Sequence, residues 1–333
     1  MTRLVQLQRG QERRVAVVDE PGLRLLANAG SVYELARTAL AGSRSLVALV
    51  KERTTGDVID YDAVYNGKSD WRLLAPIDHP DEPSRLLVSG TGLTHLGSAS
   101  NRQSMHELSE AELTDSMKMF RWGVERGRPA KGEVGISPEW FYKGNGTILR
   151  GHGDPLVIPR FGEDGGEEAE IAGVYIIDDA GQPWRIGMSN GNEFSDHKYE
   201  KKNYLNLASS KIRTCSLGPE LVLGAEFTMV PGAVAIQRSG APVWSKDIAT
   251  GESEMCHSLQ NVEHHHFKFE SHCRPGDVHV HYFGACSLSF GEGVQLADGD
   301  VMEVRFQGFG RSLRNPLVVD HEPNSLVTIH SLA

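Results

Sequence analysis

Residues 166–177, GEEAEIAGVYII, constrain the fold most, because two glutamates lead directly into an apolar, β-branched run. This composition predicts a β-strand, in which residues two apart point to the same face. Glu168 and Glu170 should therefore project side by side from a rigid element. A third acid, Glu193, follows the next strand-like segment, residues 184–188, in a turn rich in Gly, Asn and Ser.

Three acids in this arrangement have two interpretations. Hard oxygen ligands suit Mg²⁺, Mn²⁺ or Ca²⁺ better than zinc, so the acids could form a metal site. They could equally lie at an exposed strand edge and face water. An acid pair followed by a distant acid is a weak motif, so the spacing leaves both interpretations open.

Composition excludes several classes of partner. The net charge of −10 argues against a nucleic-acid backbone or an anionic membrane as the main partner. No apolar run approaches membrane-spanning length, and the first residues lack the apolar core of a signal peptide. The four cysteines are scattered without a CxxC pair, which favours reduced thiols and predicts a cytoplasmic protein.

The first part of the chain predicts a small α+β unit. Residues 4–7 and 14–19 have the composition of two short strands joined by a Gly-containing turn. Ser31 and Glu34 have the capping-box spacing and predict a helix to about residue 40. Residues 46–53 are a candidate for its continuation.

A domain boundary is predicted in residues 60–85, which are rich in Pro, Asp and Gly. We therefore expect a small N-terminal α+β domain at residues 1–75 and a second domain at residues 76–333. The last third of the chain alternates strand-like segments with turns such as Asp298-Gly299-Asp300. This spacing predicts an α+β, β-rich protein whose core is a β-sandwich, roll or barrel.

Two polar segments carry candidate functional residues. A buried strand at 85–90 runs into a Gly/Ser/Thr-rich loop that contains His95 and Ser98, and a helix is predicted from about 110 to 126. A polar loop at the mouth of a strand could be an active-site lid, although a lone loop histidine is more often solvated.

A second histidine-rich segment, residues 253–272, predicts a helix with three consecutive histidines, His264 to His266. Consecutive helical residues point roughly 100° apart, so these three cannot bind one metal. We expect them at the surface or at an interface.

Several motifs, taken in order, resemble the fumarylacetoacetate hydrolase family over roughly residues 85–320. They are Pro138-Glu139 with Lys143, the pair Glu168 and Glu170, Asn192-Glu193-Phe194-Ser195, Lys211, Gly218-Pro219, Pro275-Gly276-Asp277 and GRSLRNPL at 310–317. Each is weak alone, but their shared order is specific. The resemblance implies a mixed β-sandwich or roll with a small N-terminal domain, assembled as a homodimer or a dimer of dimers. It also implies Mg²⁺, with Mn²⁺ or Ca²⁺ as alternatives, on Glu168, Glu170 and Glu193.

Departures from the family pattern narrow the expected activity. Glu193 stands where the family usually has Asp. Hydrolytic members resemble one another in a His and a Glu three residues apart on the lid, whereas here His95 is followed by Ser98. Losing that carboxylate counts against hydrolysis. The motifs THLGS, GNEFSDH and SLRNPL look like a bacterial subgroup associated with sugar-acid catabolism, similar to 2-keto-3-deoxypentonate dehydratases that give 2-oxoglutarate semialdehyde.

The resemblance also implies roles for single residues. A 2-oxo acid can chelate a divalent ion, which then stabilises the enolate formed when the C3 proton leaves, and loss of the C4 hydroxyl follows. Lys211 would bind the substrate carboxylate or stabilise the enolate, and would act as a base if burial lowered its pKa. The alternative for Lys211 is a plain surface salt bridge. His95 would be the acid, and Ser98, Lys143 and Asn192 would bind the substrate.

Three functions remain open from the sequence. The first is a metal-dependent dehydratase of a 2-keto-3-deoxy sugar acid, acting on a small anionic 2-oxo acid. The second is a hydrolase of a 2,4-diketo acid of the acylpyruvate type, which lacks its lid carboxylate here. The third is a non-catalytic sugar-acid-binding protein, which the intact metal ligands argue against.

Overall fold

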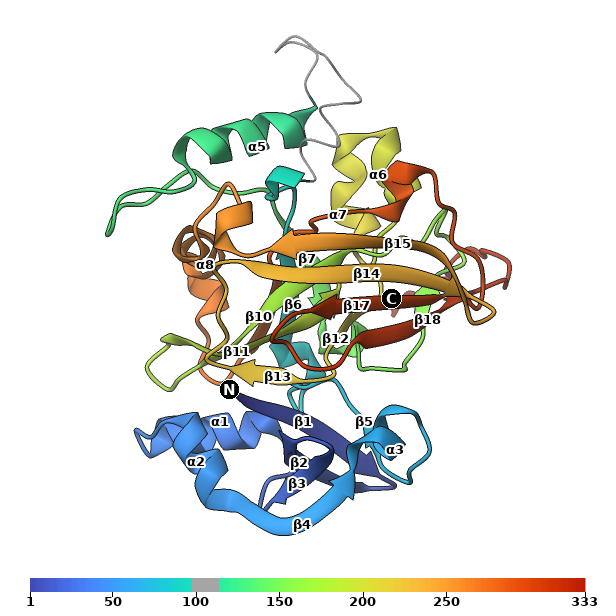
Figure 1. Ribbon diagram of the computed structural model, residues 1–333. Helices are drawn as coiled ribbons and strands as arrows, with labels where there is room; N and C mark the ends of the chain where they lie inside the picture. Colours follow the sequence, from blue (N-terminus) through green and yellow to red (C-terminus); the bar gives the residue numbers. More distant parts are fainter. Residues whose placement is uncertain (98–113, 333) are drawn as a thin grey trace.

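The computed structural model describes residues 1–97 and 114–332 and has an α+β, β-rich architecture (Figure 1). The strands are β1 Thr2–Arg9, β2 Glu12–Asp19, β3 Gly22–Leu26, β4 Thr54–Asp60, β5 Arg72–Leu73, β6 Leu86–Thr91, β7 Trp140–Asn145, β8 Leu149–Arg150, β9 Leu156–Ile158, β10 Ala169–Ile177, β11 Pro183–Asn192, β12 Cys215–Leu217, β13 Leu221–Leu223, β14 Val230–Arg238, β15 Ala241–Thr250, β16 Val278–Tyr282, β17 Val301–Phe306 and β18 Leu313–Val319. The helices are α1 Val32–Ala41, α2 Leu46–Arg53, α3 Tyr61–Tyr65, α5 Asp115–Arg126, α6 His197–Lys202, α7 Leu207–Ser210 and α8 Leu259–Phe267. No helix among these described residues is long and apolar enough to cross a membrane.

Two sheets organise the molecule. The larger has the order β4-β3-β2-β1-β13-β11-β10-β16-β6-β7, with β5, β8 and β12 attached at its side. The smaller has the order β15-β14-β17-β18-β9 and lies in front of the central strands of the larger sheet in Figure 1. The predicted sandwich-like, β-rich fold class is therefore confirmed.

The N-terminal elements form much as predicted. Both expected strands are present as β1 and β2, and Ser31 caps α1 by accepting a hydrogen bond from the backbone N–H of Glu34 at 3.1 Å. Residues 46–53 form a separate helix, α2, because the chain turns after α1 and Ser45 starts a new cap. β1 pairs with β13, so this unit extends the larger sheet. The division of the chain at residue 75 stays a prediction.

Two apolar cores hold the layers together. The first packs α1 and the N-terminal strands against one face of the central strands, with Leu4, Val32 and Val174 among its buried members. The second lies between the two sheets and includes Ile171 and Phe306. Alternate residues of β10 enter the two cores, as the period of a strand requires. β10 is therefore buried on both faces and forms a rigid base for the acids at its start.

The region of the three histidines differs from the sequence prediction. The regular helix is only α8, Leu259–Phe267, with short 3₁₀ turns near each end instead of a helix over 253–272. The expectation of surface histidines holds for His264 but is wrong for His265 and His266, which are buried. The physical reason is that α8 covers the face of β16 that carries His279, so its inner side packs against the sheet.

His266 belongs to a buried cluster of four histidines, whose other members are His272, His279 and His281. The ring nitrogens Nε2 of His266 and Nδ1 of His279 are 3.0 Å apart. The two ring nitrogens of His281 contact the hydroxyls of Ser89 and Thr91 at 2.8 and 2.9 Å. Burial, reinforced by the neighbouring histidines, lowers the pKa of His279 and that of His281 to about 3.

This cluster predicts that acid destabilises the fold. An unfolded histidine titrates near pH 6.5, so below that pH the unfolded chain binds protons that folded His279 and His281 reject. The free energy of unfolding should fall by about 1.4 kcal/mol per pH unit for each of the two residues between pH 6.5 and about 4. Denaturant titrations at pH 7, 6 and 5 measure this slope. His281→Gln should reduce it, whereas exposed His264→Gln should not, and a stability independent of pH over this range would contradict the prediction.

Candidate metal centre and active site

The hairpin of β10 and β11 brings the three predicted acids together. Glu168 precedes β10, Glu170 lies within it and Glu193 follows β11. Antiparallel pairing closes the open end of the hairpin, where the backbone N–H of Glu193 donates to the carbonyl of Glu168 at 3.0 Å. Each side chain offers one carboxylate oxygen, and these three atoms all lie within 4.8 Å of one another. All three residues are buried, so the acids do not form the exposed strand edge considered above.

Lys211 lies between two of the acids. Its Nζ donates to Glu168 Oε1 at 2.7 Å and to Glu193 Oε2 at 2.6 Å. The third donor goes to the hydroxyl of Ser195 at 2.9 Å. Burial lowers the pKa of Lys211, but the two carboxylates outweigh burial and hold it well above its usual value. Lys211 is therefore a charged donor in this state and not a free base, and it is no surface salt bridge.

Lys143 is fully buried and contacts Glu193, one of the two carboxylates that bind Lys211. Its Nζ donates to the carbonyls of Phe194 at 2.8 Å and Lys211 at 2.9 Å, and it forms an ion pair with Glu193 Oε1 at 2.5 Å. An ammonium group has three donors, and all three are used inside the protein. Lys143 therefore holds Glu193 and the neighbouring backbone in position. Substrate binding by Lys143 stays a prediction.

A β-bulge explains how Lys143 reaches Glu193. β7 pairs with β6 so that Ser89 is opposite Tyr142 while its neighbour Val88 is opposite Gly144, which leaves Lys143 as the extra residue. A bulged residue is re-aimed relative to the regular alternation of the strand. Gly144 has a φ of +146°, which only glycine adopts readily.

Asn192 and His197 also contact Glu168. The side-chain oxygen of Asn192 accepts from the backbone N–H of Glu168 at 3.1 Å, and its amide group lies 3.6 Å from the sulfur of Met302. Both ends of this side chain therefore contact protein, and substrate binding by Asn192 stays a prediction. His197, which the sequence reasoning missed, places Nε2 2.9 Å from Glu168 Oε1.

Burial and neighbouring charges shift the pKa values of Glu168 and Glu170 in opposite directions. Burial raises the pKa of Glu168, but Lys211 and His197 outweigh it and hold that pKa well below its usual range. Burial raises the pKa of Glu170 well above its usual range, and the charges of Glu193 and Glu168 raise it further. Without a further cation, burial and the two neighbouring charges therefore favour the neutral form of Glu170.

The side chains present fit a divalent metal ion. The donor set consists of three carboxylates, the hard ligands that Mg²⁺, Mn²⁺ and Ca²⁺ prefer. Oε1 of Glu170 is buried and has no hydrogen-bond partner, whereas Oε2 accepts from the backbone N–H of Gly284 at 2.7 Å. A buried, unpartnered carboxylate oxygen is costly, and a cation would relieve that cost. Metal binding would displace the proton of Glu170.

His95 lies one loop away from this centre. Its Nδ1 is 3.0 Å from the hydroxyl of Thr94, and its Nε2 is 2.7 Å from that of Thr250. A Cβ on Gly284, whose backbone contacts Glu170, would come within 3.4 Å of His95 Nδ1. Burial lowers the pKa of His95 to about 4, so its ring is neutral near pH 7. Its role as an acid stays a prediction, and Ser98 lies outside the described residues.

Glu139, from the Pro138-Glu139 motif, is a further functional candidate. Glu139 directly precedes β7, and the ring centroid of Phe141, two residues on, lies 4.7 Å from Nζ of Lys211. A Cβ on Gly90 would meet the ring of Phe141 and a Cβ on Gly92 would meet the side chain of Glu139, so Glu139 and Phe141 lie on the same face. Glu139 is buried, and the hydroxyl of Ser116 in α5 donates to its Oε1 at 3.2 Å. The period-two spacing of residues 139 and 141 was the available signal.

No protein-family model and no curated protein sequence matches the chain. Among solved structures, 2-keto-3-deoxyarabinonate dehydratase matches with a TM-score of 0.71, and 2-keto-3-deoxy-D-arabinonate dehydratase complexed with magnesium and 2,5-dioxopentanoate with 0.70. Both are 18% identical and cover 96% of this chain and 100% of theirs. A 5-carboxymethyl-2-hydroxymuconate delta-isomerase from Mycobacterium smegmatis matches with 0.55 at 17% identity, covering 96% and 100%.

These similarities establish the fold of the chain. They include a dehydratase of the kind that the sequence motifs resemble, and they agree with the predicted family resemblance at the level of fold.

Proposed function

We propose that the chain is a divalent-metal-dependent hydro-lyase that converts a 2-keto-3-deoxypentonate to 2-oxoglutarate semialdehyde. The observation that carries the proposal is the buried acid triad with Lys211 bonded to two of its members. The fold neighbour with magnesium also holds 2,5-dioxopentanoate, the anion of the proposed product, and supports the same reaction.

The triad would hold the metal, with Mg²⁺ as the first choice. Glu168, Glu170 and Glu193 supply three anionic oxygens and leave positions open for a chelating 2-oxo acid. When bound there, a divalent ion supplies Lewis-acid polarisation of the substrate's oxygens. The carboxylates themselves sit on the rigid hairpin, which fixes the substrate relative to the surrounding side chains.

Lys211 would bind and orient the substrate carboxylate. In this state its ammonium neutralises Glu168 and Glu193, and it is charged. A metal ion on the triad would neutralise the same carboxylates, which would release one donor of Lys211 for an anionic ligand. Phe141 covers one side of the ammonium and limits the directions from which water can reach it.

Glu139 would move the proton. Dehydration removes a proton from C3 and a hydroxyl group from C4, and together they leave as water. One carboxyl group that accepts the C3 proton and returns it to the departing hydroxyl balances this elimination, which leaves a C3–C4 double bond. Moving a proton from C5 to C3 then gives the C4–C5 enol. Protonation of that enol at C4, with loss of its hydroxyl proton, gives the 5-aldehyde. Glu139 directly precedes β7 on the side that carries Phe141, and the contact from Ser116 in α5 holds its side chain in place.

The reaction is tested directly with the purified protein. Incubated with Mg²⁺ and a 2-keto-3-deoxypentonate, it should release 2-oxoglutarate semialdehyde, detected by a coupled aldehyde oxidation, and chelation should abolish turnover. Glu139→Gln should lower kcat by about 100-fold or more, the usual range for loss of an acid–base group. His95→Asn should lower it much less, because the ring of His95 is bonded to Thr94 and Thr250.

Three other results would change the proposed residue roles or the proposed reaction. If His95→Asn is the damaging change and Glu139→Gln is silent, proton transfer belongs to His95. A wild-type protein that splits 2,4-diketo acids rapidly and leaves 2-keto-3-deoxypentonates untouched would overturn the dehydratase in favour of the hydrolase. Isomerisation of an unsaturated 2-oxo dicarboxylic acid is the third assay, because isomerases share the fold.

A further inference from the structure

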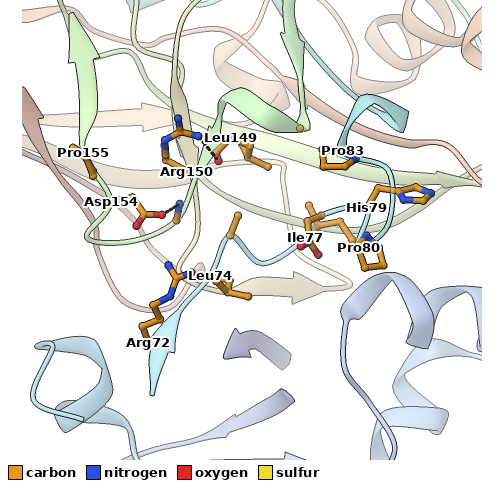
Figure 2. A pocket seen from close by; sticks show the side chains of 14 residues that line it. Arg72, Leu74, Ile77, His79, Pro80, Pro83, Leu149, Arg150, Asp154 and Pro155 are labelled. Atoms are coloured by element: carbon orange, nitrogen blue, oxygen red, sulfur yellow. Dashed lines mark hydrogen bonds between the residues drawn. The ribbon is translucent and has the colours of Figure 1, made fainter. Parts of the chain in front are cut away.

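A cavity of about 410 Å³ lies away from the acid triad, between the connector at residues 74–83 and the segment 146–155 (Figure 2). The two walls touch at both ends of the cavity. At one end, a Cβ on Gly151 would come within 2.7 Å of the backbone N of Ala75. At the other end, a Cβ on Gly146 would come within 2.8 Å of the carbonyl of Pro83. The cavity is thus a gap between two close backbone crossings.

The walls of this cavity are well defined. Pro80 and Pro83 stiffen the connector because each proline fixes its φ angle. The opposite wall contains β8, which pairs in parallel with β12. Leu74, Ile77 and Leu149 supply apolar surface. A pocket bounded in this way is largely pre-formed, as small-molecule sites usually are.

Two arginines lie at the Gly151 end of the cavity. Arg150 precedes Gly151, and Arg72 lies two residues before Leu74, whose backbone is in contact distance of Gly151. Nη1 of Arg150 donates to the carbonyls of Thr147 at 2.9 Å and Leu149 at 3.2 Å. Nη2 of Arg72 donates to the side chain of Gln8. Neither guanidinium forms an ion pair with any of the described residues, and each keeps donors free.

The acids of the cavity do not neutralise these arginines. Asp78 is bound by Arg13, with 2.7 Å between Oδ2 and Nη2, and it also accepts from Gln6. Asp154 accepts from the backbone N–H of Gly151 at 2.9 Å and forms no ion pair with a described residue. In the view of Figure 2, the side chain of Asp154 is drawn between those of Arg72 and Arg150. The cavity therefore offers the guanidinium groups of Arg72 and Arg150 as hydrogen-bond donors and the carboxylate of Asp154 as an acceptor.

We propose that this cavity binds a small hydroxylated oxyanion, held by Arg72 and Arg150. Guanidinium groups match carboxylate and phosphate oxygens in a paired, planar geometry. Asp154 would accept a hydrogen bond from a hydroxyl group on the same molecule, and the apolar wall would cover its carbon skeleton. The ligand class is therefore an aldonic acid or a sugar phosphate, which share an oxyanion head and a hydroxylated body.

The cavity is connected to the proposed active site by one of its walls, the segment 146–155. Gly146 follows Lys143 by three residues in the chain, and Leu149 pairs with Cys215, four residues after Lys211. A ligand that holds this wall in place acts on the two segments that carry these lysines. The site is independent of the metal and of the identity of the substrate, so its test uses binding and not turnover.

Thermal unfolding of the metal-free full chain measures the binding. D-Xylonate and ribose 5-phosphate are added separately up to 10 mM, with sodium chloride matched for ionic strength. At ten times its Kd, a ligand of the native state should raise the Tm by about 2 °C. Adding the two ligands separately shows which oxyanion the cavity binds. A site for a carboxylate responds to xylonate, and a site for a phosphate responds to ribose 5-phosphate.

Variants locate the binding on the cavity. Arg150→Met should remove the Tm shift, or raise the ligand concentration that gives half of the shift at least tenfold. Arg72→Met should have the same effect. It leaves intact the hydrogen bonds that Arg150 makes to backbone carbonyls. Exposed Arg305→Met in β17 is the matched control and should keep the full shift. Wild-type protein that shows no shift with either ligand at 10 mM overturns the proposal, as does an unchanged shift in Arg72→Met.

Discussion

Glu170→Gln is expected to abolish metal-dependent turnover, with a loss of about 1,000-fold or more, because several kcal/mol of Lewis-acid assistance depend on the ion. The fold should survive. Burial and the charges of Glu193 and Glu168 raise the pKa of Glu170 in the metal-free protein and so favour its neutral form, which glutamine resembles. Titration calorimetry with Mg²⁺ or Mn²⁺ measures the loss of metal affinity without any substrate.

A neighbouring glutamate provides the control. Glu167 is also fully buried, but its two oxygens accept from the backbone N–H and the hydroxyl of Ser289, each at 2.7 Å, and it is not part of the triad. Glu167→Gln should retain metal binding. Saturating Mg²⁺ should raise the Tm of the wild type and of Glu167→Gln but not that of Glu170→Gln. Equal metal affinity in Glu170→Gln and wild type would remove Glu170 from the site.

Lys143→Met is expected to cause the largest loss of stability. The substitution keeps the length of the side chain but leaves Glu193 with one cation fewer in a fully buried position. Removing one member of a buried ion pair costs about 3–5 kcal/mol, and the carbonyls of Phe194 and Lys211 lose their donor as well. Denaturant unfolding in the presence of a chelator measures the change.

A double variant distinguishes the ion pair from simple packing. Lys143→Met with Glu193→Gln removes both charges, so it should be less destabilised than the sum of the two single changes by at least about 1 kcal/mol. Exposed Lys68→Met is the surface control and should stay within about 0.5 kcal/mol of the wild type. Strict additivity of the two single changes would mean that the two charges are not coupled.

The convergence of the acids could be anticipated because it is local. Glu168, Glu170 and Glu193 belong to one hairpin, and a strand period of two with a single antiparallel return suffices to bring them together. The fold class followed in the same way from strand spacing and turn residues. These inferences depend on neighbours in the sequence, which the sequence displays directly.

The contacts that depend on tertiary pairing could not be anticipated. The inward direction of Lys143 depends on the bulge between β6 and β7, and nothing in WFYKGN marks a bulge except its glycine. The alternation in VHVHY predicts a strand with one polar face, and polar faces usually meet water. Here α8 covers that face, so His279 and His281 are buried.

The continuity of the larger sheet determines where this chain can be shortened. Thr2–Leu4 pair with Leu221–Leu223, so β1 shields β13 from solvent along its hydrogen-bonding side. A truncation that begins after residue 75 would leave β13 with unpaired backbone groups and would uncover the apolar face that Leu4 and Val32 now bury. Exposed edges with apolar side chains are templates for intermolecular pairing. Expression of residues 76–333 alone should therefore give aggregated material, and the full chain is the unit to produce.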